Sequence, residues 1–182
     1  MAKTSKSTLP VAAVRTRRAY FDCRFGQLHV RTAFPTTGGF DEQVTLVCLH
    51  AAPGSSRMFA RFLPQIADVR SVYAPDLPGL GESDPSPSAS VADAASAISD
   101  LAHDLRLRQI DLLGVRSGAQ VALELAAARP DLVRRLVLVD APSAGRSPSK
   151  QPTLALHAAD DLFEAGAKTL AAQIGGFLAG RA

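Results

Sequence analysis

The chain has 182 residues, which is enough to bury the core of one domain and short for two. Hydrophobic residues make up 47% of it and tryptophan is absent, which predicts a globular, water-soluble protein with small core side chains. The net charge is +3, but residues 1–18 hold five basic side chains and no acid. The basic character therefore belongs to a tail, so no nucleic-acid partner is expected. No apolar run approaches the ~20 residues of a membrane span.

Residues 1–18 are interpreted as a flexible basic leader and residues 19–182 as a single domain. An acid-free start with Ser and Thr is also compatible with an organelle address, but a disordered leader is the simpler interpretation. Cys23 and Cys48 fall on expected strands, and no neighbouring Cys or His completes a metal-ligand pattern. We therefore expect no disulfide, metal or cofactor, and the cytoplasm is the expected compartment.

Six stretches before residue 110 have the pattern of regular elements. Two strand-like runs joined by Gly26-Gln27 predict an antiparallel hairpin. Two continuous apolar runs predict buried strands, because parallel strands covered on both faces lack polar alternation. Two stretches with apolar residues at helical spacing predict helices, the first kinked or divided by Pro64. These are residues 19–25 and 28–34 for the hairpin, 44–50 and 69–74 for the strands, and 58–66 and 91–107 for the helices.

A strand–turn–helix–strand pattern follows at residues 110–142. Apolar runs at 110–113 and 136–139 predict two buried strands, and a helix at 119–128 ends near Pro130. This βαβ unit predicts an α/β fold with a mostly parallel sheet and helices on both faces.

Three motifs resemble those of the α/β-hydrolase family. Gly114 and Gly118 lie two residues on either side of Arg116, the spacing of the family's nucleophile elbow. The loop DLPGLGESD at 76–84 is similar to the family's Asp-x-Pro-Gly-x-Gly-x-Ser loop, and HAAP at 50–53 to its His-Gly-x-Pro oxyanion loop. The resemblance runs from about residue 20 to 142 and resumes weakly at 152. It implies a hydrolase acting on ester or related acyl substrates, with a small-molecule ligand.

In this register Arg116 occupies the family's nucleophile position. Shifting by one residue makes Ser117 the nucleophile, but then Val115 takes a position that needs a small residue, and a β-branched side chain fits poorly there. The first register is therefore favoured. An arginine cannot serve as a nucleophile, since its guanidinium stays protonated, with a pKa of about 12.5–13.8, and offers no lone pair.

The resemblance also assigns the remaining parts of a catalytic site. Backbone N–H groups of Ala52 and Ser117 would form the oxyanion hole, and Asp161 would be the triad acid, with Asp160 one residue off. The family's chain order is nucleophile, acid, histidine, yet no histidine follows Asp161. His50 is the nearest alternative base for Ser117, although in the family the corresponding histidine is usually structural.

The C-terminal part, residues 143–182, is shorter than the family pattern. Nine residues at 143–151 replace the lid and its helix, so we expect no lid. The family's last strand, which leads to the triad histidine, should lie between Asp161 and the final helix, and we expect it to be missing as well. A strand at 154–157 would either join the sheet through a connection that has no helix, which leaves apolar surface exposed, or pair poorly. Such a surface would favour a homo-oligomer. A last helix is expected at 164–178.

Three functions remain open. The first is an α/β-hydrolase relative with little or no hydrolytic activity, because Arg116 replaces the nucleophile and no triad histidine follows Asp161. The second is a weak esterase that uses Ser117 with His50. The third is a module that binds a carboxylate or phosphate at Arg116, beside the first N–H groups of a helix. In a purely structural alternative, Arg116 pairs with Asp161 or points to solvent through a cleft that has no lid.

Overall fold

A computed structural model describes residue 14 and residues 16–36, 43–142, 150–157 and 161–180. Its strands form one seven-stranded sheet with helices on both faces, which confirms the predicted α/β class. The strands are β1 (Thr16–Cys23), β2 (Gly26–Ala33), β3 (Leu46–Leu49), β4 (Val72–Pro75), β5 (Ile110–Val115), β6 (Val133–Val139) and β7 (Thr153–Leu156). The helices are the 3-10 helix η1 (Ser56–Phe59) and α1 (Leu63–Ile66), α2 (Val91–Asp104), α3 (Ser117–Ala128) and α4 (Ala167–Leu178).

The strand order is β1-β2-β4-β3-β5-β6-β7. β2 runs antiparallel to β1 and to β4, whereas β4, β3, β5, β6 and β7 are mutually parallel. The carboxyl ends of five strands therefore meet at one edge of the sheet, the edge at which open α/β sheets bind ligands.

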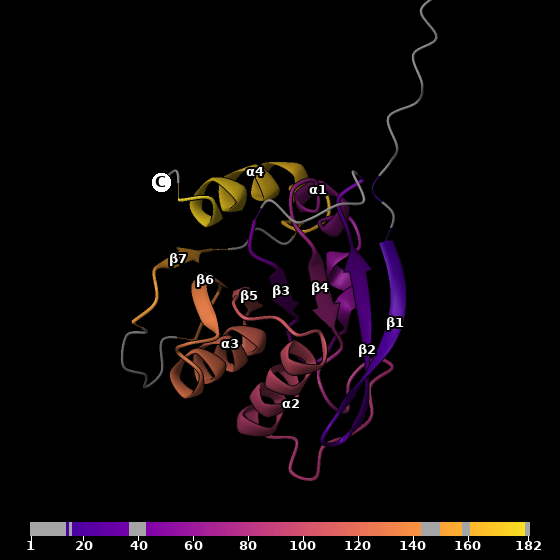
Figure 1. Ribbon diagram of the computed structural model, residues 1–182. Helices are drawn as coiled ribbons and strands as arrows, with labels where there is room; N and C mark the ends of the chain where they lie inside the picture. The colour runs from indigo at the N-terminus through magenta and orange to yellow at the C-terminus, as the bar shows by residue number, and fades with distance from the viewer. Residues whose placement is uncertain (1–13, 15, 37–42, 143–149, 158–160, 181–182) are drawn as a thin grey trace, which may run out of the picture.

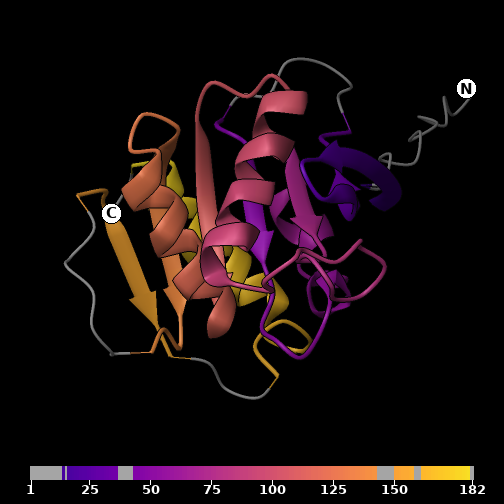
Figure 2. The same ribbon diagram turned by 90° about the horizontal axis from the view of Figure 1, so that it is seen from below.

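Each face of the sheet is covered by a different pair of helices. Figure 1 shows α1 and α4 on one side and α2 and α3 on the other, and Figure 2 looks onto the α2–α3 side. Neighbouring residues of β5 point into different cores: Leu112 packs in the cluster with α2 and α3, and Leu113 in the cluster with α1 and α4. Burial on both faces explains the unbroken apolar runs of the inner strands.

The N-terminal hairpin forms as expected, but its turn is Arg24-Phe25 and not Gly26-Gln27. Gly26 and Gln27 belong to β2 because Asp84 approaches them there, and its Oδ2 accepts the Gln27 N–H at 2.8 Å. Residues 1–13 and 15 of the expected leader lie outside the described residues. The boundary after residue 18 is wrong, however, since β1 already begins at Thr16.

Two predicted helices are interrupted for backbone reasons. The stretch at 58–66 divides into η1 and α1, and Pro64 lies in the first turn of α1. N–H groups of a first turn have no acceptor within the helix, so the missing N–H of proline costs no hydrogen bond there. The helix expected at 91–107 ends at Asp104, because Arg106 takes a φ of +54° that a right-handed helix cannot continue.

The strand predicted at 154–157 forms as β7 and pairs better than expected. β7 is parallel to β6 over four residues, with Leu154 and Leu156 half-buried towards α4 and the small Thr153 and Ala155 exposed. Within the described residues the exposed large hydrophobic side chains are Tyr20 and Phe34, which lie towards the β1–β2 side of the sheet. The expected apolar surface at β7 is therefore wrong, and with it the reason for an oligomer there.

The final helix α4 starts at Ala167, three residues later than expected, because a turn at Asp161–Gly166 precedes it. Leu170, Ala171 and Ile174 face inward as predicted. Among the helices in the described part of the chain, none combines the length and apolar character that a membrane crossing requires.

Candidate functional site

The residue at the sharp bend between β5 and α3 is Arg116. Its backbone has φ +50° and ψ −112°, a conformation that residues with a side chain rarely adopt. The two flanking glycines are required because backbone atoms of neighbouring segments lie too close to them for a side chain. A Cβ on Gly114 would lie 2.6 Å from the Cα of Ala119, and one on Gly118 would lie 2.3 Å from the carbonyl oxygen of Leu49. The register that centres the bend on Arg116 therefore agrees with the backbone.

Ser117 is the first residue of α3, one step beyond the bend. Its Oγ accepts a 2.7 Å hydrogen bond from the backbone N–H of Ala52. This N–H was expected to be a free oxyanion donor, and in the structure it is occupied. The serine hydroxyl thus fills the place that the oxygen of an acyl group would need.

His50 is fully buried at the end of β3 and both its ring nitrogens are engaged. Nδ1 lies 2.9 Å from the carbonyl oxygen of Ala51, and Nε2 accepts the N–H of Leu77 at 2.9 Å. These partners fix the tautomer with the proton on Nδ1, since a carbonyl only accepts and an N–H only donates. Burial lowers the pKa of His50, which favours the same neutral ring. The structure therefore does not bring His50 to Ser117 as a base.

Asp161 is exposed and begins the turn before α4. Among the described residues, the acid that pairs with Arg116 is Asp140, which follows β6: the Arg116 Nε lies 3.8 Å from its Oδ2. His157, which follows β7, approaches the other oxygen of Asp140 at 3.6 Å. The structure pairs Arg116 with Asp140 and not with Asp161, because Asp140 directly follows β6, the strand adjacent to β5. Asp160 lies outside the described residues.

The loop after β4 is shaped by Asp76, whose oxygens accept hydrogen bonds from the N–H groups of Ser56 and Glu82 and from His29. Burial by itself would raise the pKa of Asp76, but the bonds from Ser56, Glu82 and His29 outweigh it and hold the pKa below its ordinary value. Asp76 is thus a structural carboxylate that fixes the 76–84 loop, as its motif suggests.

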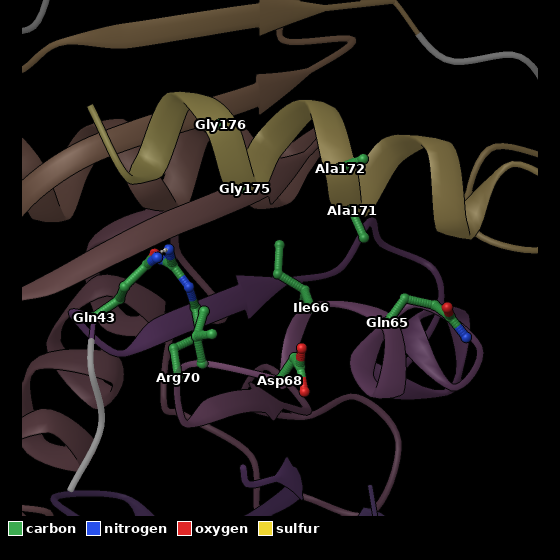
Figure 3. A pocket seen from close by; sticks show the side chains of 10 residues that line it. Gln43, Gln65, Ile66, Asp68, Arg70, Ala171, Ala172, Gly175 and Gly176 are labelled. Atoms are coloured by element: carbon green, nitrogen blue, oxygen red, sulfur yellow. Dashed lines mark hydrogen bonds between the residues drawn. The ribbon is translucent and has the colours of Figure 1, made fainter. Parts of the chain in front are cut away.

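A cavity of about 110 Å³ adjoins Ser117, lined among others by Ala52, Leu77 and Val121. It is well below the 300–1,000 Å³ or so of a typical ligand pocket. A larger hollow of about 380 Å³ lies under α4, where Figure 3 shows Gly175 and Gly176 above Ile66 and Arg70. Since Arg70 precedes β4, that hollow is at the amino ends of the strands and does not belong to the bend.

The sequence pattern did not predict Asp140 as the partner of Arg116, nor His157 as a neighbour of Asp140. The available signal was their position, since each directly follows a strand, and the carboxyl ends of adjacent parallel strands meet. Among the described residues no group of three or more His, Cys, Asp or Glu side chains is arranged to hold a metal ion.

Comparisons with known proteins agree with this architecture. Residues 44–181 match the family model for the alpha/beta hydrolase fold, which is more than half of the chain. The chain belongs to the α/β-hydrolase family.

The relatives include an uncharacterized hydrolase of Bacillus subtilis (strain 168), YugF, which is 30% identical over 112 residues, 60% of this chain and 40% of YugF. A haloalkane dehalogenase of Bradyrhizobium diazoefficiens is 32% identical over 109 residues, 59% of this chain and 35% of that enzyme. Among solved structures, Cfl2 of Burkholderia cenocepacia has a TM-score of 0.63 at 27% identity, over 74% of this chain and 47% of Cfl2. The chain thus spans less than half the length of these relatives.

Proposed function

We propose that this chain carries the fold of a hydrolase without an efficient hydrolytic centre. The observation that supports the proposal is the arginine at the β5–α3 bend, the residue with the φ of +50°. Nucleophilic catalysis on this fold requires a hydroxyl, thiol or carboxylate at that point, and a guanidinium has no lone pair to supply. Further chain beyond this sequence would not change the residue at the bend.

The contacts around the bend support the same proposal. The Ser117 hydroxyl accepts from the Ala52 N–H, so it is held in the place where an oxyanion would bind. The ring nitrogens of His50 are both bound to backbone groups, so this histidine cannot take a proton from Ser117 without breaking one of those bonds. The alternative of a weak esterase built on Ser117 therefore has an unactivated nucleophile.

The test is turnover of p-nitrophenyl acetate and butyrate together with labelling by a fluorophosphonate probe. We expect the same rates for the wild type, Arg116→Ala and Ser117→Ala, and no covalent label on any of them. Thermal unfolding of each variant verifies that it is folded. Turnover or labelling of the wild type that disappears in Ser117→Ala would establish the esterase instead.

A second candidate function is binding of a small carboxylate or phosphate at Arg116. The observation in its favour is the exposure of the arginine side chain, 62%, at the first turn of α3. Asp140 at 3.8 Å competes with any such anion. This candidate predicts a thermal stabilisation by millimolar acetate or phosphate that Arg116→Ala abolishes, and an unchanged melting temperature would exclude it.

A further inference from the structure

A separate hollow of about 260 Å³ opens between β2, η1 and the loop after β4. Its lining includes His29 and Arg31 from β2, Arg57 from η1, and Asp76 and Glu82 from the loop. The residues of the β5–α3 bend do not line it. It is therefore distinct from the site described above.

Three buried side-chain atoms of the lining residues have no hydrogen-bond partner. His29 is 1% exposed, and while its Nδ1 is bound to Asp76 Oδ2 at 2.9 Å, its Nε2 is unpaired. The Nε of Arg31 and the Oγ of Ser56 are likewise buried and unpaired. Buried polar atoms are almost always hydrogen-bonded, so three unpaired atoms at one hollow indicate a missing partner.

The charges around the hollow specify that partner as an anion. Arg31 lies directly across the β1–β2 ladder from Arg18, and like charges in that arrangement repel. Arg57 adds a third guanidinium from η1. Of the two acids, Asp76 already accepts from three donors, and Glu82 accepts the Tyr20 hydroxyl at 3.0 Å.

We propose that this hollow binds a phosphate group. The Nε–H of Arg31 and the guanidinium of Arg57 would donate to phosphate oxygens, and the bound charge would relieve the repulsion between Arg18 and Arg31. With the Nδ1 proton donated to Asp76, the unpaired Nε2 of His29 accepts from a P–OH. A carboxylate supplies no O–H for this contact, which favours phosphate over acetate.

The test measures thermal unfolding of the whole chain with inorganic phosphate, with glycerol phosphate and with acetate, at constant ionic strength. Phosphate at ten times its dissociation constant should raise the melting temperature by roughly 3–6 °C. Arg31→Gln should abolish the rise without lowering stability in the absence of phosphate, since it also removes a like-charge pair. Glycerol phosphate acting like inorganic phosphate would identify a phosphomonoester as the ligand, and inorganic phosphate acting alone would identify the free ion.

The matched control is Arg17→Gln, which removes the same charge from β1. Arg17 is the neighbour of Arg18, and successive side chains of a strand point to opposite faces of the sheet, so Arg17 points away from the face that holds Arg18 and Arg31. Arg17→Gln and Arg116→Gln should both keep the full rise. No rise in the wild type, a rise that persists in Arg31→Gln, or an equal rise with acetate would overturn the proposal. Loss of the rise in Arg116→Gln alone would place the anion at the β5–α3 bend instead.

Discussion

At the scale of single residues, Arg116 has an unfavourable backbone conformation at the bend, and the arginine side chain does not require that conformation. Its φ of +50° is paired with a ψ of −112°, outside the left-handed helical minimum at which Asn and Asp are tolerated. Backbone strain of this kind persists because the surrounding structure imposes it, here through β5 and α3 on either side of the bend. The strain is independent of the chemistry of the side chain.

Replacing Arg116 with glycine should therefore stabilise the protein relative to replacing it with alanine. We expect the free energy of unfolding of Arg116→Gly to exceed that of Arg116→Ala by about 1–2 kcal/mol. This difference is the backbone strain that a side chain causes here, minus the entropy that glycine loses on folding. Both variants remove the same charge near Asp140, so the comparison isolates the backbone. Urea unfolding at pH 7 measures the difference, and equal midpoints would contradict the strain.

At the scale of elements, the contact between α3 and the sheet depends on glycine, whereas α4 contains glycines with no packing role. Gly118 lies against the carbonyl oxygens of Leu49 and His50, so the start of α3 rests directly on the end of β3. Around Gly175 and Gly176 an added Cβ would meet no atom within 4 Å. The same residue type thus has opposite consequences in two helices.

This contrast gives a paired prediction. Gly118→Ala should lower the free energy of unfolding by about 1–3 kcal/mol or more, because its Cβ would lie 2.3 Å from the Leu49 oxygen. Gly176→Ala should raise it by about 0.5–1 kcal/mol, because alanine favours the helix interior and the space is free. Chemical denaturation of both variants checks the signs, and a stabilising Gly118→Ala would disprove the close contact.

At the scale of the whole molecule, a buried ion network joins the sheet to the last helix. Asp111 on β5 is fully buried and accepts from Arg70 at 3.2 Å and from Arg134 on β6 at 2.6 Å. Burial lowers the pKa of the Arg70 guanidinium, and the charge of Asp111 opposes that shift. Arg134 also donates to the carbonyl oxygen of Leu178, at the end of α4. The network therefore fixes the C-terminus of α4 against the sheet.

Removing the central acid should destabilise the whole domain. Asp111→Ala leaves Arg70 buried without a counter-charge, and a loss of about 3–5 kcal/mol is expected. The matched control is Asp131→Ala, which breaks the exposed pair of Arg129 with Asp131 and should have a much smaller effect. Thermal and urea unfolding of both variants measure the loss in the free energy of unfolding. Similar losses in the two variants would show that the buried network contributes little.

Much of the architecture was predictable from the pattern of apolar residues. The inner strands appear as unbroken apolar runs because both of their faces are covered, and Gly114 and Gly118 located the bend correctly. The ends of elements were less predictable: the turn moved to Arg24-Phe25 because Asp84, distant in sequence, binds the Gln27 N–H. Contacts of this kind leave no local signal.

The sequence alone determined the family, the sheet with helices on both faces, and the arginine at the bend, because spacing and residue type carry that information. Only the tertiary structure decided which partners the site residues have. The Ser117 hydroxyl is bound to Ala52, both nitrogens of His50 are occupied, and Arg116 faces Asp140 in place of Asp161. These pairings depend on which strands lie side by side and on where their ends meet, and distances of that kind are set by packing across the whole sheet.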